Sequence, residues 1–446
     1  MMKKLNRRQF IKNSSLVTLA GLGGVQVGFG SSLLKGAGAG SSKDLLVYVF
    51  LNGGIDGLNI VPPKSGTDYS EYSTVLRPSL HIPSSDSLSL NGSSAFGLHP
   101  LATGMRDLFN QDKMAIIHAT GLLEPNRSHF VATALMELGI QNTAATLPTG
   151  WITRYFNSSL GTTDGSLIPS LVPSTNNTDA VLGDPTSLIM ASPTSFSLNR
   201  GHWAWGGPMQ ETFAEIFNNP TSQEDVVAHQ TLNASQIVEG IDWDNYTPGN
   251  SAQYPTGFFG NQLRTVAQMF KEDVGLEIAY IPTGGWDTHI DQGTGIGGDG
   301  LFGDLVQNLS DGLHALYQDL TASHAGKFTI IVQSEFGRRA YENDSNGTDH
   351  GYGNPMFVIG DDVNGGFYGN FPGLQPAQLL GGDDVDVTVD YRDVVSEVLM
   401  KRMHNRFLGY IFPQYANYTP LGIVSGVDLN PVYEFDYDLL YKSGFE

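Results

Sequence analysis

Acidic and imidazole side chains lie in Gly-flanked loops that follow predicted strands of this sequence. They are Asp56, Asp287, His289, Glu335, Asp349 and His350. Carboxylate oxygens and imidazole nitrogens bind divalent cations such as Zn²⁺, Mn²⁺, Mg²⁺ and Ca²⁺, and glycine lets a loop turn tightly against a ligand. Each loop alone is also compatible with a solvated turn. Because four such loops follow successive strands, we predict a site for one or two divalent metal ions.

A hydroxyl that could act as a nucleophile stands at the start of a predicted helix. Ser128 lies between Arg127 and His129, just before the apolar stretch 131–138. Serine at this position is commonly a helix N-cap, but a helix N-terminus also attracts anions, and a hydroxyl there can attack a bound phosphoryl or sulfuryl group. We therefore predict catalytic roles for these three residues. Arg338, which follows another strand, is predicted to hold an oxyanion.

The elements that must position these residues alternate between strands and helices. Short apolar runs predict strands at Leu45–Leu51, Met114–Ala119, Glu277–Pro282, Phe328–Gln333 and Met356–Ile359. Apolar residues at helical spacing predict helices over 263–270, 302–320 and 394–399, with Asp390 capping the last. This alternation predicts an α/β fold with a doubly wound, mostly parallel sheet, whose ligands gather at the carboxyl ends of the strands.

One stretch interrupts this alternation. Residues from about 155 to 258 are rich in Ser, Thr, Asn and Pro, with one amphipathic helix around 209–217. We interpret the stretch as a loop-rich insertion, or cap, within a single domain that spans residues 41–446.

The first 40 residues have the parts of an export signal. NRRQFIK (6–12) matches a twin-arginine consensus, 16–27 is a weakly apolar stretch, and Ala37-Gly38-Ala39 offers a cleavage site. A membrane anchor is the weaker alternative, because this stretch is short and Gly-rich. We predict a signal peptide read by the twin-arginine translocon and a periplasmic or extracellular protein with no stable membrane anchor.

Charge and cysteine content exclude several classes of partner. Residues 1–40 hold six of the 24 basic residues and no acidic one, so the remainder carries 18 basic and 45 acidic residues, a formal charge of −27. Such a surface repels nucleic acid and anionic lipid. The chain has no cysteine, which excludes disulfides and thiolate metal sites.

Six segments, in chain order, resemble the DUF1501 family of twin-arginine-exported bacterial proteins. They are FLNGGIDGLNIVPP, RSHF, TGW with Arg154, GGWDTH, SEFGRR and GTDHGYG. The resemblance covers most of the chain from Leu45 to Leu399. This family is grouped with the alkaline-phosphatase-like, sulfatase-like superfamily. The resemblance therefore implies a three-layer α/β/α sandwich that commonly binds two divalent metals and uses a Ser, Thr or modified residue as nucleophile.

The resemblance also implies roles for individual residues. Asp56 would be the early metal-binding carboxylate, and Ser128 would occupy the nucleophile position. Asp287, with His289 or Asp291 and then His350, would serve one metal, and Glu335 the other. The superfamily's Asp-His pair is here Glu335-Phe336, so one imidazole is missing, for which His129 or Asp349 could compensate. No cysteine is present as a formylglycine precursor, which excludes that sulfatase mechanism.

The leading hypothesis is an exported, metal-dependent hydrolase of phosphate or sulfate esters acting on a small-molecule or glycan substrate. The alternative is a non-catalytic, cation-stabilised surface or matrix protein that binds glycans. A nucleotide-binding oxidoreductase is disfavoured, because segment 53–57 lacks the G-x-G-x-x-G spacing.

Overall fold

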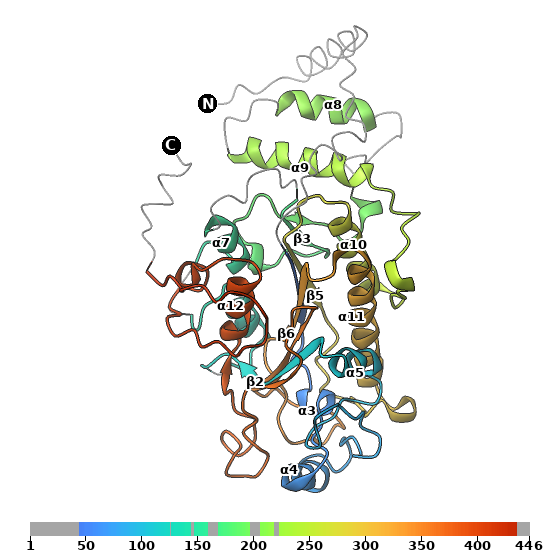
Figure 1. Ribbon diagram of the computed structural model, residues 1–446, viewed down its shortest axis with the longest axis vertical. Helices are drawn as coiled ribbons and strands as arrows, with labels where there is room; N and C mark the ends of the chain where they lie inside the picture. The colour runs from blue at the N-terminus through green and yellow to red at the C-terminus, as the bar shows by residue number, and fades with distance from the viewer. Residues whose placement is uncertain are drawn as a thin grey trace.

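The structure is a computed structural model that describes residues 44–124, 126–143, 147–158, 168–196, 206–217 and 223–434 (Figure 1). The predicted signal peptide lies outside the described residues. Among the helices that are described, none combines the length and apolar character needed to cross a bilayer.

Within the described residues, nine strands form one sheet in the order β4-β3-β5-β1-β6-β7-β2-β8, with β9 beside β2. The strands are β1 Leu45–Leu51, β2 Met114–Gly121, β3 Ser170–Val172, β4 Leu188–Ile189, β5 Ile278–Thr283, β6 Phe328–Ser334, β7 Asn354–Ile359, β8 Gly366–Tyr368 and β9 Val389–Asp390. All five predicted strands are present. Every pairing is parallel except those of β7, which runs antiparallel to both β6 and β2.

The centre of the sheet is built from β1, β5 and β6. Every residue of β1 and β6 is buried, as expected of parallel strands covered by helices on both faces. The parallel register places Leu51 beside both Thr283 and Ser334. The loops that follow these three strands therefore begin at the same level, which brings their polar residues to one edge of the sheet.

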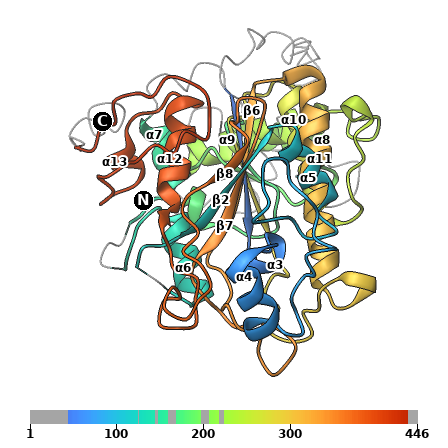
Figure 2. The same ribbon diagram turned by 60° about the horizontal axis from the view of Figure 1, so that its bottom comes forward.

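Helices cover both faces of the sheet (Figures 1 and 2). Residues of α5, α10 and α11 pack into the core on one face, and residues of α6, α7, α12 and α13 into the core on the other. The α-helices are α3 Gly57–Ile60, α4 Gly66–Glu71, α5 Thr103–Asn110, α6 His129–Glu137, α7 Trp151–Ser158, α8 Gly206–Ile216, α9 Gln223–Gly240, α10 Phe258–Lys271, α11 Phe302–His324, α12 Tyr391–Lys401 and α13 Leu408–Ile411. The predicted three-layer α/β/α fold with a mostly parallel sheet is confirmed, and Asp390 caps α12 as predicted.

The stretch predicted to be an insertion contributes to the sheet as well as lying outside it. The short strands β3 and β4 extend the sheet at one edge, whereas α8 and α9 lie together beyond that end of the molecule (Figure 1). The amphipathic helix predicted around 209–217 is α8.

Candidate metal centre

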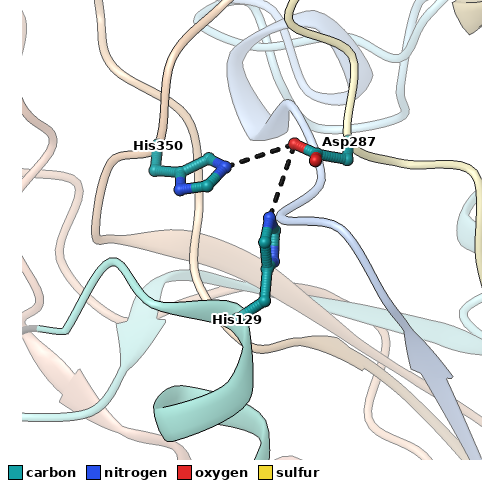
Figure 3. A group of neighbouring side chains, drawn as sticks. All are labelled: His129, Asp287 and His350. Atoms are coloured by element: carbon teal, nitrogen blue, oxygen red, sulfur yellow. Dashed lines mark hydrogen bonds and ion pairs between the residues drawn. The ribbon is translucent and has the colours of Figure 1, made fainter.

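Three residues from distant parts of the chain meet at the edge where β1, β5 and β6 end (Figure 3). His129 is the first residue of α6, Asp287 lies in the loop after β5, and His350 lies in the loop before β7. One ligand atom from each lies within 4.8 Å of the other two, so the group could hold a metal ion. Because β7 is antiparallel to its neighbours, its beginning reaches the edge where the parallel strands end.

A third imidazole, that of His289, joins this group. The Oδ1 atom of Asp287 lies 3.1 Å from Nε2 of His289, 3.2 Å from Nε2 of His350 and 3.4 Å from Nε2 of His129. The Nε2 atoms of His289 and His350 are 2.8 Å apart. Three ring nitrogens therefore face one carboxylate oxygen.

Each of these imidazoles also has an acceptor at its other nitrogen. The Nδ1 partners are Glu335 Oε1 for His129 at 2.6 Å, Asp349 Oδ1 for His289 at 3.0 Å, and the backbone oxygen of Arg127 for His350 at 2.8 Å. A hydrogen donated from Nδ1 fixes the neutral tautomer whose Nε2 presents a lone pair. Metal-binding histidines are held in this way by carboxylates and backbone carbonyls.

The charges around the group are consistent with bound cations. Partial burial raises the pKa of Asp287, but the hydrogen bond from Arg338 and the contact with His350 outweigh it and bring that pKa to about 2. Burial lowers the pKa of His350, which keeps its ring neutral. The hydrogen bond to Glu335 raises the pKa of His129. The centre therefore offers an ionised carboxylate beside the neutral ring of His350 at neutral pH.

Arg338, predicted to hold an oxyanion, holds the loops together. Its buried guanidinium donates to the backbone oxygens of Gly54 at 2.5 Å, Thr348 at 2.7 Å and Trp286 at 3.0 Å, and to Oδ1 of Asp287 at 2.7 Å. These contacts join the loops after β1 and β5 to the loop before β7. The structure thus places this arginine beneath the site, in contact with the candidate ligand Asp287.

The other two residues predicted to be catalytic differ in how far they are engaged. Arg127 pairs with Asp384 and lies over the ring of Tyr352, 4.4 Å from its centroid. Ser128 is exposed at the N-cap of α6, and its hydroxyl makes no capping hydrogen bond. The side chain of Ser128 is therefore exposed, whereas that of Arg127 is engaged with protein groups.

Asp56, predicted as a metal ligand, lies apart from the three imidazoles. It is fully buried and accepts hydrogen bonds from Arg77 at 2.5 Å and from Nε2 of Gln292 at 2.6 Å. The Oε1 atom of Gln292 accepts from the hydroxyls of Thr288 and Thr348. These threonines lie next to candidate ligands or their partners, so Asp56 supports the two loops from below. The roles of Arg77 and Gln292 could not be foreseen from any motif in the sequence.

Glu335 and Asp349 were also predicted as metal ligands, and both stand behind an imidazole. Glu335 is buried; its Oε1 accepts from His129 and from the backbone N–H of Gly53 at 2.8 Å, and its Oε2 accepts from the hydroxyl of Ser334 at 3.0 Å. Both of its oxygens are engaged. The imidazole of His129 therefore stands between Glu335 and the point where an ion would lie.

An open cleft of about 410 Å³ adjoins the centre. Its walls are the outward face of α6, the loops that follow β1, β5 and β6, and Asp179 at the start of a short 3₁₀ turn. Both His129 and Asp287 line it. A substrate in the cleft can therefore reach the group of Figure 3.

Comparisons with known proteins agree with the resemblance found in the motifs. Residues 209–405 match the family model described as "Protein of unknown function (DUF1501)". No curated protein matches the sequence.

Three solved structures show weak likeness to the chain. They are Ps i-CgsB in complex with k-i-k-neocarrahexaose (8% identity over 85% of this chain and 75% of that chain, TM-score 0.34), alkaline phosphatase from the Antarctic bacterium TAB5 (11% over 72% and 93%, TM-score 0.30), and a mutant of that phosphatase with Mg bound in its M3 site (10% over 74% and 94%, TM-score 0.29). At these scores the likeness carries no argument about activity. The family model matches residues 209–405, and the ordered motifs of the chain resemble the same DUF1501 family.

Proposed function

We propose that this protein is an exported, metal-dependent hydrolase of phosphate or sulfate esters, with one ion held by Asp287, His129, His289 and His350. The observation that carries the proposal is the convergence of three Nε2 atoms on one carboxylate oxygen, each ring being held by an acceptor at Nδ1. When each Nδ1 donates its hydrogen, the Nε2 atoms of His289 and His350 turn lone pairs towards each other. These lone pairs repel unless a cation or a ring proton lies between them.

The donor set favours a particular class of ion. Imidazole nitrogens suit Zn²⁺ and other transition metals, whereas Ca²⁺ and Mg²⁺ prefer sites made of oxygens. Three nitrogens and one oxygen therefore favour Zn²⁺ or Mn²⁺. The engaged oxygens of Glu335 leave no evident ligand for a second ion there, so we propose a single one.

Residues of the chain account for the remaining steps. A bound ion would supply Lewis-acid polarisation of the ester oxygens. The exposed hydroxyl of Ser128 would attack phosphorus or sulfur, and its proton would pass to the alcohol that leaves. Water would then cleave the resulting serine ester and regenerate the hydroxyl. The free N–H groups in the first turn of α6 favour the anionic ester next to that hydroxyl. Because Arg127 and Arg338 are engaged with protein groups, we assign the neutralisation of the ester oxygens to the ion and to this helix terminus.

Because Arg127 and Arg338 are paired with protein carboxylates, they also favour an alternative function, that of a non-catalytic, cation-stabilised surface or matrix protein. In that case the same ligands would hold an ion that only stabilises the loops. In either case we propose that residues 1–40 direct export through the twin-arginine pathway to the periplasm or beyond.

Metal content tests the site directly. Purified mature protein, dialysed and measured by inductively coupled plasma mass spectrometry, is expected to retain one equivalent of Zn or Mn. His350→Ala is expected to lose it. His404→Asn is the matched control, because His404 is an exposed imidazole outside the centre, with a left-handed φ of 54° that asparagine tolerates. Retention of no metal by the wild type would refute the proposal.

Activity assays separate the hydrolase from its rival. Aryl phosphate, phosphodiester and aryl sulfate substrates are assayed with Zn²⁺, Mn²⁺, Mg²⁺ or Ca²⁺ added. Turnover that disappears in Ser128→Ala supports the serine nucleophile, and turnover unchanged in that variant removes it from the mechanism. Calcium alone, bound without turnover of any ester, supports the rival.

A further inference from the structure

We infer that the cleft beside the metal centre binds the leaving group of the ester and selects one that carries a positive charge, such as an amino alcohol. This inference rests on the proposed hydrolase function. It concerns the part of the cleft that extends away from the three imidazoles, along α6 towards Asp179.

The shape of the cleft follows from the spacing of residues on α6. Phe130, Thr133, Ala134 and Glu137 all line it, and their spacing of three, four and seven residues places them on one face of a helix. With a rise of about 1.5 Å per residue, this stripe runs about 10 Å outward from the first turn, where His129 lies. A leaving group attached to an ester at the metal centre would extend along this stripe.

Acidic residues stand at the far end of that stripe, where burial raises the pKa of the Glu137 carboxyl and the exposed Asp179 supplies the charge. Asp179 is exposed, and its backbone N–H donates to Oε2 of Glu137 at 2.8 Å. The Oε1 atom of Glu137 accepts from the hydroxyl of Tyr280 at 2.8 Å. No described residue of the cleft lining is a lysine or arginine. An anionic leaving group would therefore be repelled, and a cation attracted, at this end.

An aromatic ring stands between the metal centre and the acidic end. Phe130 is 91% exposed although it is a large apolar residue, and it is adjacent in sequence to His129. The face of an aromatic ring attracts ammonium groups through its quadrupole. An exposed ring followed by carboxylates is thus suited to an alkylammonium group, whose apolar substituents contact the ring while its charge faces Asp179.

Matched esters measure this selectivity. Phosphocholine carries a quaternary ammonium, 3,3-dimethylbutyl phosphate has the same shape without the charge, and 2-carboxyethyl phosphate carries a negative charge. We expect kcat/KM to fall in that order for the metal-loaded wild type. Equal values, or a neutral sugar phosphate exceeding phosphocholine, would overturn the inference while leaving the hydrolase proposal in place.

Variants assign the preference to the cleft rather than to the chemistry of the esters. Asp179→Asn is expected to lower the ratio of kcat/KM for phosphocholine over its neutral isostere by about fivefold, as for a partly exposed charge pair. Phe130→Leu should lower it less. Asp86→Asn, which changes an exposed carboxylate outside the cleft, should leave the ratio unchanged. An unchanged ratio in Asp179→Asn contradicts the assignment.

A binding measurement separates the two proposals when no ester is turned over. Isothermal titration calorimetry of metal-free protein should show tighter binding of choline than of 3,3-dimethylbutanol, with the difference reduced in Asp179→Asn. That result without hydrolysis would refute the hydrolase and support cation selection by the cleft. No difference between the two alcohols would refute cation selection.

Discussion

Two regions at the same edge of the sheet differ in the burial and the partners of their carboxylates. In the closed region Asp56 is fully buried and paired with a buried arginine, Arg77. In the open region the side chain of Asp287 is 49% exposed and faces three imidazoles. Both carboxylates follow a parallel strand in a Gly-rich loop. Each carboxylate is paired with a buried arginine, Arg77 for Asp56 and Arg338 for Asp287, but only Asp287 also faces three ring nitrogens. Only the second arrangement leaves room for an external cation.

Removing the buried arginine should have the largest effect. Arg77→Met leaves Asp56 as an uncompensated buried charge, so the free energy of unfolding is expected to fall by about 3–5 kcal/mol. Asp287→Asn should cost less, because its carboxylate is half exposed and the buried Arg338 keeps its hydrogen bonds to backbone oxygens. Urea denaturation of the metal-free variants measures both values. Equal losses would abolish the distinction between the two regions.

A buried imidazole on β2 gives the next effect. Burial lowers the pKa of His118 to about 4, and its ring stacks on Phe367. Because the folded-state pKa lies below the unfolded value, its contribution to stability is complete above about pH 6.5 and is lost as the pH falls towards 4. The loss should reach at most about 3 kcal/mol. Denaturation curves of wild type and His118→Phe between pH 7 and 4 test this, and parallel curves would contradict it.

Changing the carboxylate that accepts a hydrogen bond from His129 should lower metal affinity more than it lowers the stability of the fold. Glu335→Gln keeps the shape of the side chain but removes the charge that holds His129, so zinc affinity should fall about 10- to 100-fold. Asp349→Asn, a matched change behind His289, should have a smaller effect because that carboxylate is exposed. Competition with a zinc chelator measures both affinities. A larger loss in the aspartate variant would reverse the predicted order.

The smallest effect on stability and zinc affinity is expected for Asp291, which the family resemblance suggested as an alternative ligand to His289. Asp291 is exposed, and its described contact is a backbone hydrogen bond to Ser345. Its φ of 48° is tolerated by asparagine. Asp291→Asn should therefore change stability by less than about 0.5 kcal/mol and leave zinc affinity unchanged. A tenfold loss of affinity would make Asp291 a ligand.

The strands were predictable because burial on both faces leaves a continuous apolar run. The predicted bounds of β1 match the structure, as does the cap of α12 by Asp390. The direction of β7 could not be predicted, since a short apolar run is the same in either orientation. That direction explains how His350, which precedes its strand, reaches the edge where the other loops end.

The residues of the site were harder to predict than the strands. Gly-flanked acids pointed to loops that the structure brings together at one edge of the sheet, but not to which carboxylate would be buried. A buried aspartate requires a partner, yet nothing in the sequence around Arg77 marks it as that partner. The ligand position of His129 depends on where α6 begins relative to Asp287, which is a matter of tertiary structure.

The four proposed ligands are drawn from residue 129 to residue 350, and they meet only after β2, β5, β6 and β7 have joined one sheet. A nascent chain that ends before His350 lacks one of them, however well its earlier strands have formed. An ion that needs all four ligands would therefore bind only after the chain has been synthesised past His350 and the sheet has formed. In a pathway that transports folded cargo, such an ion would mark the molecules that are ready to leave.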